Sequence, residues 1–188
     1  MERKSFDTKK LTYIALLTAI VAVLQYLGTF IKLGQFSVSL VLVPIVMGAA
    51  LCGTVAATWL GFAFGACVLM YGDAAAFLVI NPLGTVLTVL LKGALAGLLS
   101  GVAYKLLEGV NRYVAVVVSA IVCPVVNTGI FILGCYAFFL PTITEWAGGT
   151  NAGVYILTVL VGANFFFELL FNALIAPTLV RVINLKKQ

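Results

Sequence analysis

The sequence predicts an all-α integral membrane protein, a bundle of six transmembrane helices with both termini in the cytoplasm. Three observations predict this class: 63% of the 188 residues are apolar, only 9% are charged, and the mean hydropathy is +1.20. Six membrane-spanning helices of roughly 20 residues need about 120 positions, which the apolar content supplies. We therefore expect one multi-pass domain over residues 1–188 in the cell membrane.

The first three spans follow from the longest uncharged runs. Residues 11–31 form one such run without a cleavage-site pattern, and they predict a retained first span. The next run is too long for one perpendicular helix, and its glycines Gly48 and Gly53 suit a tight reversal. We therefore divide it into two short helices over 37–51 and 54–71.

The last three spans are delimited by prolines and a polar turn. The fourth, over 83–106, starts after Pro82, where proline costs little in a first helical turn. The fifth covers 113–140 and is predicted to end at Pro141. The sixth, over 154–183, is too long for one crossing, so we expect tilt or an end outside the bilayer.

The basic residues are distributed unevenly between the two faces of this topology. Nine of the eleven lie in the N-terminal segment, the turn 105–112 or the C-terminal segment. The opposite face has only Lys32, and Lys92 falls within a span. By the positive-inside rule both termini are cytoplasmic. The net charge of +5 then reflects contact with anionic lipid rather than with nucleic acid.

Several catalytic classes lack their characteristic residues. Histidine is absent, and there is no G-x-x-x-x-G-K phosphate loop. An ATPase, a histidine-based hydrolase and a histidine metal site are therefore not expected. The four cysteines lie in apolar runs without C-x-x-C spacing and are predicted to be buried thiols. We expect no enzymatic activity, no cofactor and no metal.

Small residues four apart mark where helices can approach closely. Two glycine-rich stripes, one on each of the third and fourth spans, are expected to pack inside the bundle. Ala15 and Ala19 form a third stripe, on the first span, which could pack inside or face a partner subunit. The glycine-rich stripes are Gly53, Ala57, Gly61 and Gly65, and Gly93, Gly97 and Gly101.

Ionisable residues within the apolar spans are candidates for function, because an isolated charge in hydrocarbon is costly. There are two, Lys92 and Glu168. They could form a structural salt bridge between two helices. Alternatively, they could belong to a polar site, because Asn164, Glu168 and Asn172 are spaced i, i+4, i+8 on one helix face.

Other polar residues at similar depth extend this pattern into a predicted small-molecule site between spans four, five and six. Asn127 and Thr128 lie on the fifth span, and Thr85 and Thr88 on the fourth. The loops 31–36, 72–82 and 141–153 would cap the site. Flat walls could come from Phe165, Phe166, Phe167, Trp146 and Tyr155, although lipid contact or core packing is an alternative for the phenylalanines.

Three further residues could lie at the mouth of this site. They are Asp73, Asn81 and Asn151, and each could instead form a turn or cap a helix. The predicted substrate-binding residues are therefore Lys92, Asn127, Asn164, Glu168, Asn81 and Asn151.

Five segments together resemble a known family, the substrate-binding S components of energy-coupling factor (ECF) vitamin transporters, over essentially the whole chain. They are Lys10 to Ala19 (KLTYIALLTA), Leu42 to Gly48 (LVPIVMG), Asn81 to Thr85 (NPLGT), Leu91 to Gly97 (LKGALAG) and the polar-studded last helix.

The resemblance implies a subunit that captures a water-soluble vitamin or precursor from outside the cell. It would work with a membrane coupling protein, contacted through Ala15 and Ala19, and with two separate ATP-binding subunits. The family's sites use the outer halves of helices four to six, which favours Lys92, Asn127, Asn164 and Glu168 as ligand contacts.

The vitamin and the transport mechanism stay open at this point. One lysine and one glutamate suit a ligand with a carboxylate plus hydroxyl or amide groups, such as pantothenate, or a neutral pyrimidine or pyridine. The alternatives to an S component are a stand-alone proton-coupled carrier using Glu168 and Lys92, and a structural subunit without a ligand.

Overall fold

The computed structural model describes residues 8–30, 32–33, 36–37 and 40–186, and helices make up most of them. The elements in chain order are α1 (Thr8–Gly28), β1 (Lys32–Leu33), β2 (Phe36–Ser37), α2 (Leu42–Cys52), α3 (Thr54–Met70), α4 (Ala75–Ile80), α5 (Pro82–Leu107), α6 (Arg112–Gly134), the π-helical turn η1 (Cys135–Phe139), α7 (Leu140–Trp146), α8 (Ala152–Tyr155), the π-helical turn η2 (Ile156–Gly162) and α9 (Ala163–Lys186).

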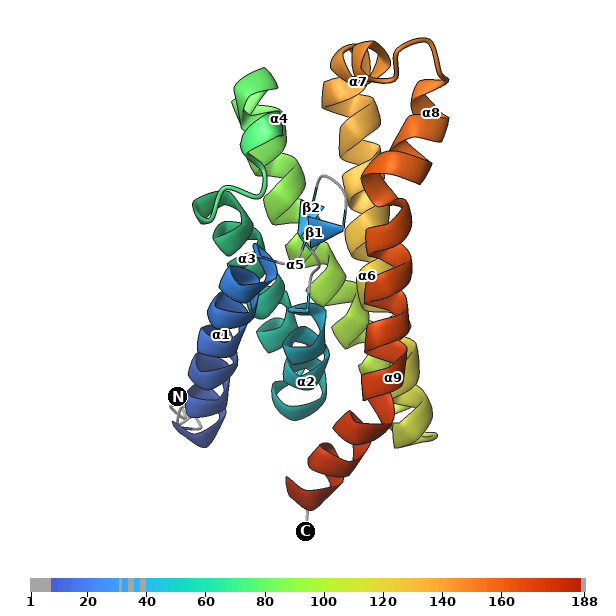
Figure 1. Ribbon diagram of the computed structural model, residues 1–188. Coiled ribbons are helices and arrows are strands. Elements are labelled where there is room, and N and C mark those ends of the chain that lie inside the picture. Colours follow the sequence, from blue (N-terminus) through green and yellow to red (C-terminus); the bar gives the residue numbers. More distant parts are fainter. Residues whose placement is uncertain (1–7, 31, 34–35, 38–39, 187–188) are drawn as a thin grey trace.

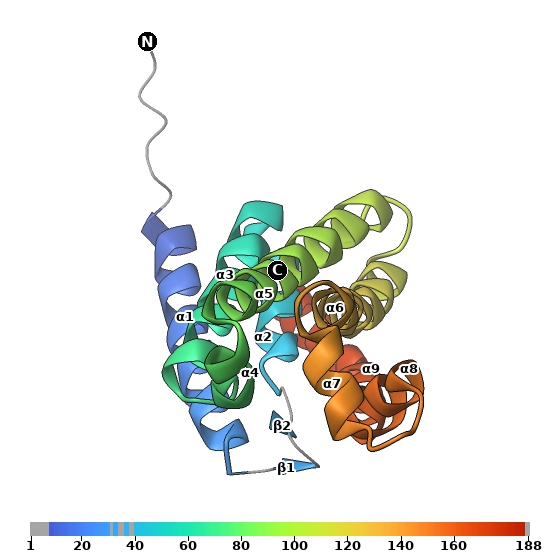
Figure 2. The same ribbon diagram turned by 90° about the horizontal axis from the view of Figure 1, so that it is seen from above.

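The helices form one elongated bundle (Figure 1). The start of α1 and the end of α9 lie at the same end of it, and α7 and α8 lie at the other (Figure 1). The view from above shows α5 and α6 beside each other, with α1 and α3 on one side and α9 on the other (Figure 2). Strands β1 and β2 pair antiparallel, Lys32 with Ser37 and Leu33 with Phe36.

Three described helices are long and apolar enough to cross a membrane by themselves. They are α1, α5 and the continuous helix Arg112–Trp146, which has 35 residues. A fourth crossing results if Ala152–Gly162 and Asn164–Thr178, which meet at 42°, form one bent span. The segments predicted as the second and third spans correspond to α2 and α3, which are shorter apolar helices of 11 and 17 residues.

The helix of the predicted fifth span does not end at Pro141. The chain continues through η1 into α7 and stays helical to Trp146. Pro141 follows directly after the π-helical turn η1, where the hydrogen-bonding pattern of the helix changes locally, so the helix passes the proline. The predicted loop 141–153 is therefore partly helical, as is 72–82, which contains α4. In the predicted loop 31–36, residues 31, 34 and 35 lie outside the described residues.

Glycines bring α3 and α5 into backbone contact, which confirms the predicted internal packing of most of the two stripes. A Cβ atom built on Gly61 would overlap the carbonyl oxygen of Gly93, and one built on Gly97 would overlap that of Ala57. Gly53 has the different role of reversing the chain between α2 and α3 with φ +90°. The close contact fixes the rotation of α5 about its own axis, and so decides which of its side chains face inward.

Adding one methyl group to this contact tests its importance. We expect Gly97→Ala to lower the free energy of unfolding by about 1–3 kcal/mol, because the backbone of Ala57 cannot move aside easily. Gly129→Ala is the matched control, since a Cβ there meets no atom within 4 Å, and helix propensity alone predicts a gain of up to about 1 kcal/mol. Thermal unfolding in detergent measures both. Equal melting temperatures for the two variants would contradict the packing argument.

Candidate ligand-binding cavity

A cavity lies among α5, α6 and α9, and α1 and the α3–α4 connection complete its wall. The volume of the cavity is about 80 Å³. The lining residues are Gln25, Val68, Asp73, Ala74, Phe77, Thr85, Thr88, Val89, Lys92, Asn127, Thr128, Phe131, Phe139, Leu160, Val161, Asn164, Phe165 and Glu168.

Four of the predicted substrate-binding residues meet at this cavity. Lys92 comes from α5, Asn127 from α6, and Asn164 and Glu168 from α9. Asn164 and Glu168 share the wall because residues four apart lie on one helix face. Asn172, the third member of that stripe, is buried outside the cavity, and its Nδ2 donates a hydrogen bond to the backbone oxygen of Glu168 at 2.8 Å.

The Lys92 ammonium lies between two aromatic rings. Its Nζ is 5.6 Å from the ring centroid of Phe64 and 5.6 Å from that of Phe131. Aromatic faces attract a cation through their negative π-clouds. The carboxylates of Glu168 and Asp73 also stabilise the positive charge of Lys92 by Coulomb attraction, and the contribution of Glu168 is the larger one. Lys92 therefore belongs to a group with two carboxylates rather than to the single pair considered from the sequence.

Gln25 is a cavity residue that sequence reasoning missed. It lies on α1, is 1% exposed, and its Nε2 donates a hydrogen bond to Asp73 Oδ2 at 2.5 Å. The contact joins the first helix to the α3–α4 connection, so Asp73 belongs to the wall. The available signal was that Gln25 is the one amide side chain in the apolar run 11–31, but the polar pattern that predicted the site lies on spans four to six.

Several buried acceptors in the cavity lack a hydrogen-bond partner among the described residues. They are Gln25 Oε1, Thr88 Oγ1 and Asn127 Oδ1. Buried polar atoms in native proteins almost always have a partner, because leaving one unsatisfied costs about 1–3 kcal/mol. These three atoms therefore give the wall unused capacity for hydrogen bonds.

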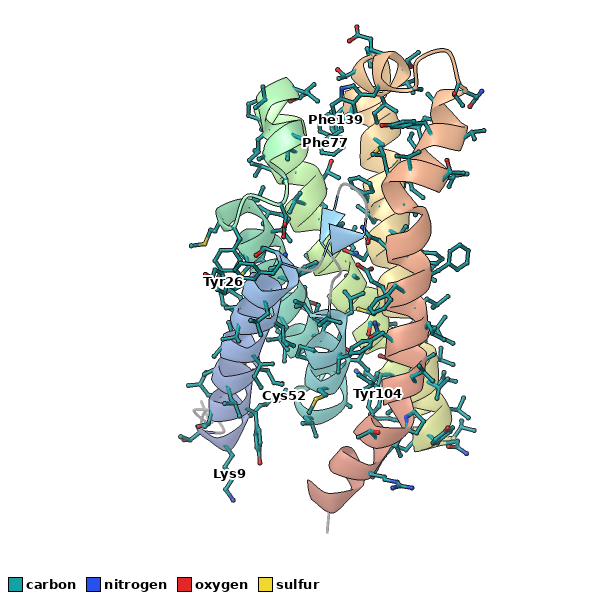
Figure 3. All side chains as sticks on the ribbon, in the orientation of Figure 1. Lys9, Tyr26, Cys52, Phe77, Tyr104 and Phe139 are labelled. Carbon is teal, nitrogen blue, oxygen red and sulfur yellow. The ribbon has the colours of Figure 1, made fainter. Side chains whose placement is uncertain are left out.

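An aromatic group closes one side of the cavity. The ring of Phe77 on α4 packs edge-on against Phe139 at 4.8 Å between centroids, and against Phe131 at 5.9 Å. Figure 3 shows Phe77 and Phe139 together near the end of the bundle that holds α7. Phe165 also lines the cavity.

The other predicted aromatic walls lie elsewhere. Phe166 and Phe167 are 69% and 41% exposed and do not line the cavity. Their exposure agrees with the alternative of lipid contact. Trp146 packs against Phe77 but does not line the cavity, and Tyr155 packs in the neighbouring apolar cluster.

Asn81 and Asn151 cap helices and do not line the cavity. Asn81 Oδ1 accepts a hydrogen bond from the backbone N–H of Gly84 at 2.9 Å, at the start of α5. Asn151 Oδ1 accepts one from Gly153 at 2.8 Å, at the start of α8. The structure thus gives both residues the capping role that the sequence analysis left as their alternative.

A second concave surface lies between α1 and α3 and includes Ala15 and Ala19, which are both exposed. Most of its other lining residues are apolar, and Lys10 and Thr18 are the polar ones. Trp59 connects α3 to α1, because its Nε1 donates a hydrogen bond to Thr18 Oγ1 at 3.2 Å. We call this surface the α1–α3 groove.

The cavity combines charged, amide and hydroxyl side chains with apolar ones, and it lies among helices that are apolar enough to cross a membrane. The family model described as "ECF transporter, substrate-specific component" matches residues 9–180. The chain therefore belongs to this family, which confirms the resemblance found in the sequence. Its members are substrate-binding components of transporters rather than enzymes. No curated protein and no solved structure matches the chain.

The capping role of Asn81 predicts an effect on stability alone. We expect Asn81→Ala to lower the free energy of unfolding by about 1 kcal/mol, because the Gly84 N–H loses its acceptor. Asn81→Ser keeps a side-chain oxygen at that position and should retain most of the stability. Thermal unfolding of the two variants measures this difference. A loss of equal size in both variants would show that the oxygen is not responsible.

Proposed function

We propose that this protein is the six-span S component that binds a water-soluble vitamin or vitamin precursor from outside the cell. A separate membrane coupling protein and two ATP-binding subunits would use ATP to drive its uptake. The observation that carries the proposal is the cavity, where Lys92, Asn127, Asn164 and Glu168 meet. The family match supports a binding subunit and gives no support to a stand-alone proton-coupled carrier.

The proposed orientation places both termini in the cytoplasm. Lys9 and Lys10 are exposed at the start of α1, and Arg181 is exposed in the last part of α9. These two helix ends lie at the same end of the bundle (Figure 1). The cavity uses the first half of α5, the second half of α6 and the first half of α9. It would therefore lie in the outer half of the membrane.

The proposed six-span count depends on the two short helices. At 1.5 Å per residue, the 17 residues of α3 rise about 26 Å, close to the roughly 30 Å of a hydrocarbon core. The 11 residues of α2 rise only about 16 Å.

The binding role is tested by thermal stabilisation of the purified chain in detergent against a panel of water-soluble vitamins and precursors, pantothenate included. A ligand at a thousand times its dissociation constant should stabilise the fold by about 4 kcal/mol. We expect a clear shift for one compound, and a smaller shift for Glu168→Gln and Asn164→Ala. The exposed Glu145→Gln on α7 is the control and should respond like the wild type. A flat panel with folded protein would contradict the proposal.

The coupling role proposed for the α1–α3 groove predicts a different phenotype. Replacing both Ala15 and Ala19 by leucine should abolish uptake in cells that contain the coupling protein and ATPases, because bulk on this face blocks close helix approach. Ligand binding by the purified variant should stay unchanged. Ala173→Leu, on an exposed position of α9, is the matched control. Loss of ligand binding in the double variant would show that these alanines support the fold.

A further inference from the structure

We propose that the ligand is an organic cation, in which a protonated amine or a cationic nitrogen ring is joined to a flat apolar group. This inference rests on the proposed function and names the chemical class of the molecule that the cavity binds. Three independent features of the wall support it: its charge, the direction of its hydrogen-bonding groups and its aromatic surface.

The first feature is charge. Among the described residues that line the cavity, the charged ones are Asp73, Lys92 and Glu168, which together carry one net negative charge when ionised. Both carboxylates already act on the lysine. A ligand carboxylate would add a third negative charge to this group in surroundings of low dielectric, where repulsion is strong. A ligand cation would balance the charge.

The second feature is the orientation of Gln25. Its Nε2 donates a hydrogen bond to the carboxylate of Asp73. An ionised carboxylate only accepts hydrogen bonds, so exchanging the amide oxygen and nitrogen of Gln25 would place two oxygens against each other. Its Oε1 is therefore left buried as an acceptor without a partner among the described residues. Asn127 Oδ1 is a second such acceptor. Unused acceptors favour a ligand that donates hydrogen bonds.

The third feature is the group of phenylalanines on the same wall. Phe77, Phe131, Phe139 and Phe165 all line the cavity. Aromatic faces pack against flat apolar groups, and they attract desolvated cations with an energy of up to about 2 kcal/mol. Carboxylates beside aromatic rings form a site for a cationic nitrogen on an apolar framework.

These features change the choice of ligand made from the sequence alone. Lys92 and Glu168 by themselves balance each other, which left an anion such as pantothenate open. The contact between Gln25 and Asp73, whose residues are 48 positions apart in the chain, adds a second carboxylate and an oriented acceptor.

The test uses ligands that share one ring and differ in charge. Pyridoxamine, pyridoxine and 4-pyridoxate carry an amine, a hydroxyl and a carboxylate on the same pyridine framework. Thiamine, a permanent cation, and pantothenate, an anion, widen the comparison. Thermal stabilisation and calorimetric titration of the full chain in detergent measure the binding of each compound.

We expect a cationic compound to bind at least about tenfold more tightly than its neutral or anionic counterpart, the size expected for one hydrogen bond to a charged group. Asp73→Asn and Glu168→Gln should each weaken the cation by about tenfold and leave the neutral compound nearly unchanged. Glu145→Gln, an exposed carboxylate that does not line the cavity, should change neither.

The outcomes separate this inference from the function on which it rests. Binding of an anion that equals or exceeds that of every cation overturns the cation proposal and leaves the proposed function intact. The proposal is also overturned if a cation binds and its affinity is unchanged by both Asp73→Asn and Glu168→Gln. A flat response to every compound by folded protein overturns the binding function itself, and the inference with it.

Discussion

The backbone contact between α3 and α5 is the constraint on which the binding cavity depends. Without side chains at Gly61, Gly93 and Gly97, the two helices approach until their backbones touch. This contact fixes the rotation of α5, which turns Thr85, Thr88 and Lys92 toward the cavity. It also brings the Lys92 ammonium over the ring of Phe64 on α3. In a bilayer, where apolar burial gives little preference for one helix rotation over another, such close packing decides the geometry.

Around this fixed pair, buried polar groups decide what the protein can bind. The polar residues of α5, α6 and α9 lie in a setting where water cannot freely satisfy them, so each needs a partner in the protein or a ligand. Ser100 and Ser119 pair with each other, at 2.8 Å between their hydroxyl oxygens, and the Nδ2 of Asn172 donates to the backbone oxygen of Glu168 on its own helix. Gln25, Thr88 and Asn127 retain unsatisfied atoms, and all three line the cavity. Asn172 Oδ1 also lacks a partner among the described residues, and it lies outside the cavity.

The two concave surfaces have opposite chemistry, which fits a division of labour within one small chain. The cavity combines charges, amides and hydroxyls with aromatic rings, whereas the α1–α3 groove is lined mostly by apolar side chains, with Lys10 and Thr18 as its polar residues. Gln25 and Ala15 lie on the same helix, ten residues apart, with Gln25 buried in the cavity wall and Ala15 exposed in the groove. The first helix therefore contributes to both concave surfaces.

The sequence by itself determined the membrane class, the approximate bounds of the helices and most polar residues of the cavity wall, which are Thr85, Thr88, Lys92, Asn127, Thr128, Asn164 and Glu168. Hydropathy, capping residues and helical periodicity are local properties, so Asn81 at the start of α5 and the stripe Asn164–Glu168 could be found without a fold. Only the tertiary structure decided that Asp73 and Gln25 join the wall, that Asn81 and Asn151 do not, and that the helix continues beyond Pro141. These depend on contacts between distant segments, or on a π-helical turn whose shape is set by its neighbours, and no local pattern encodes them.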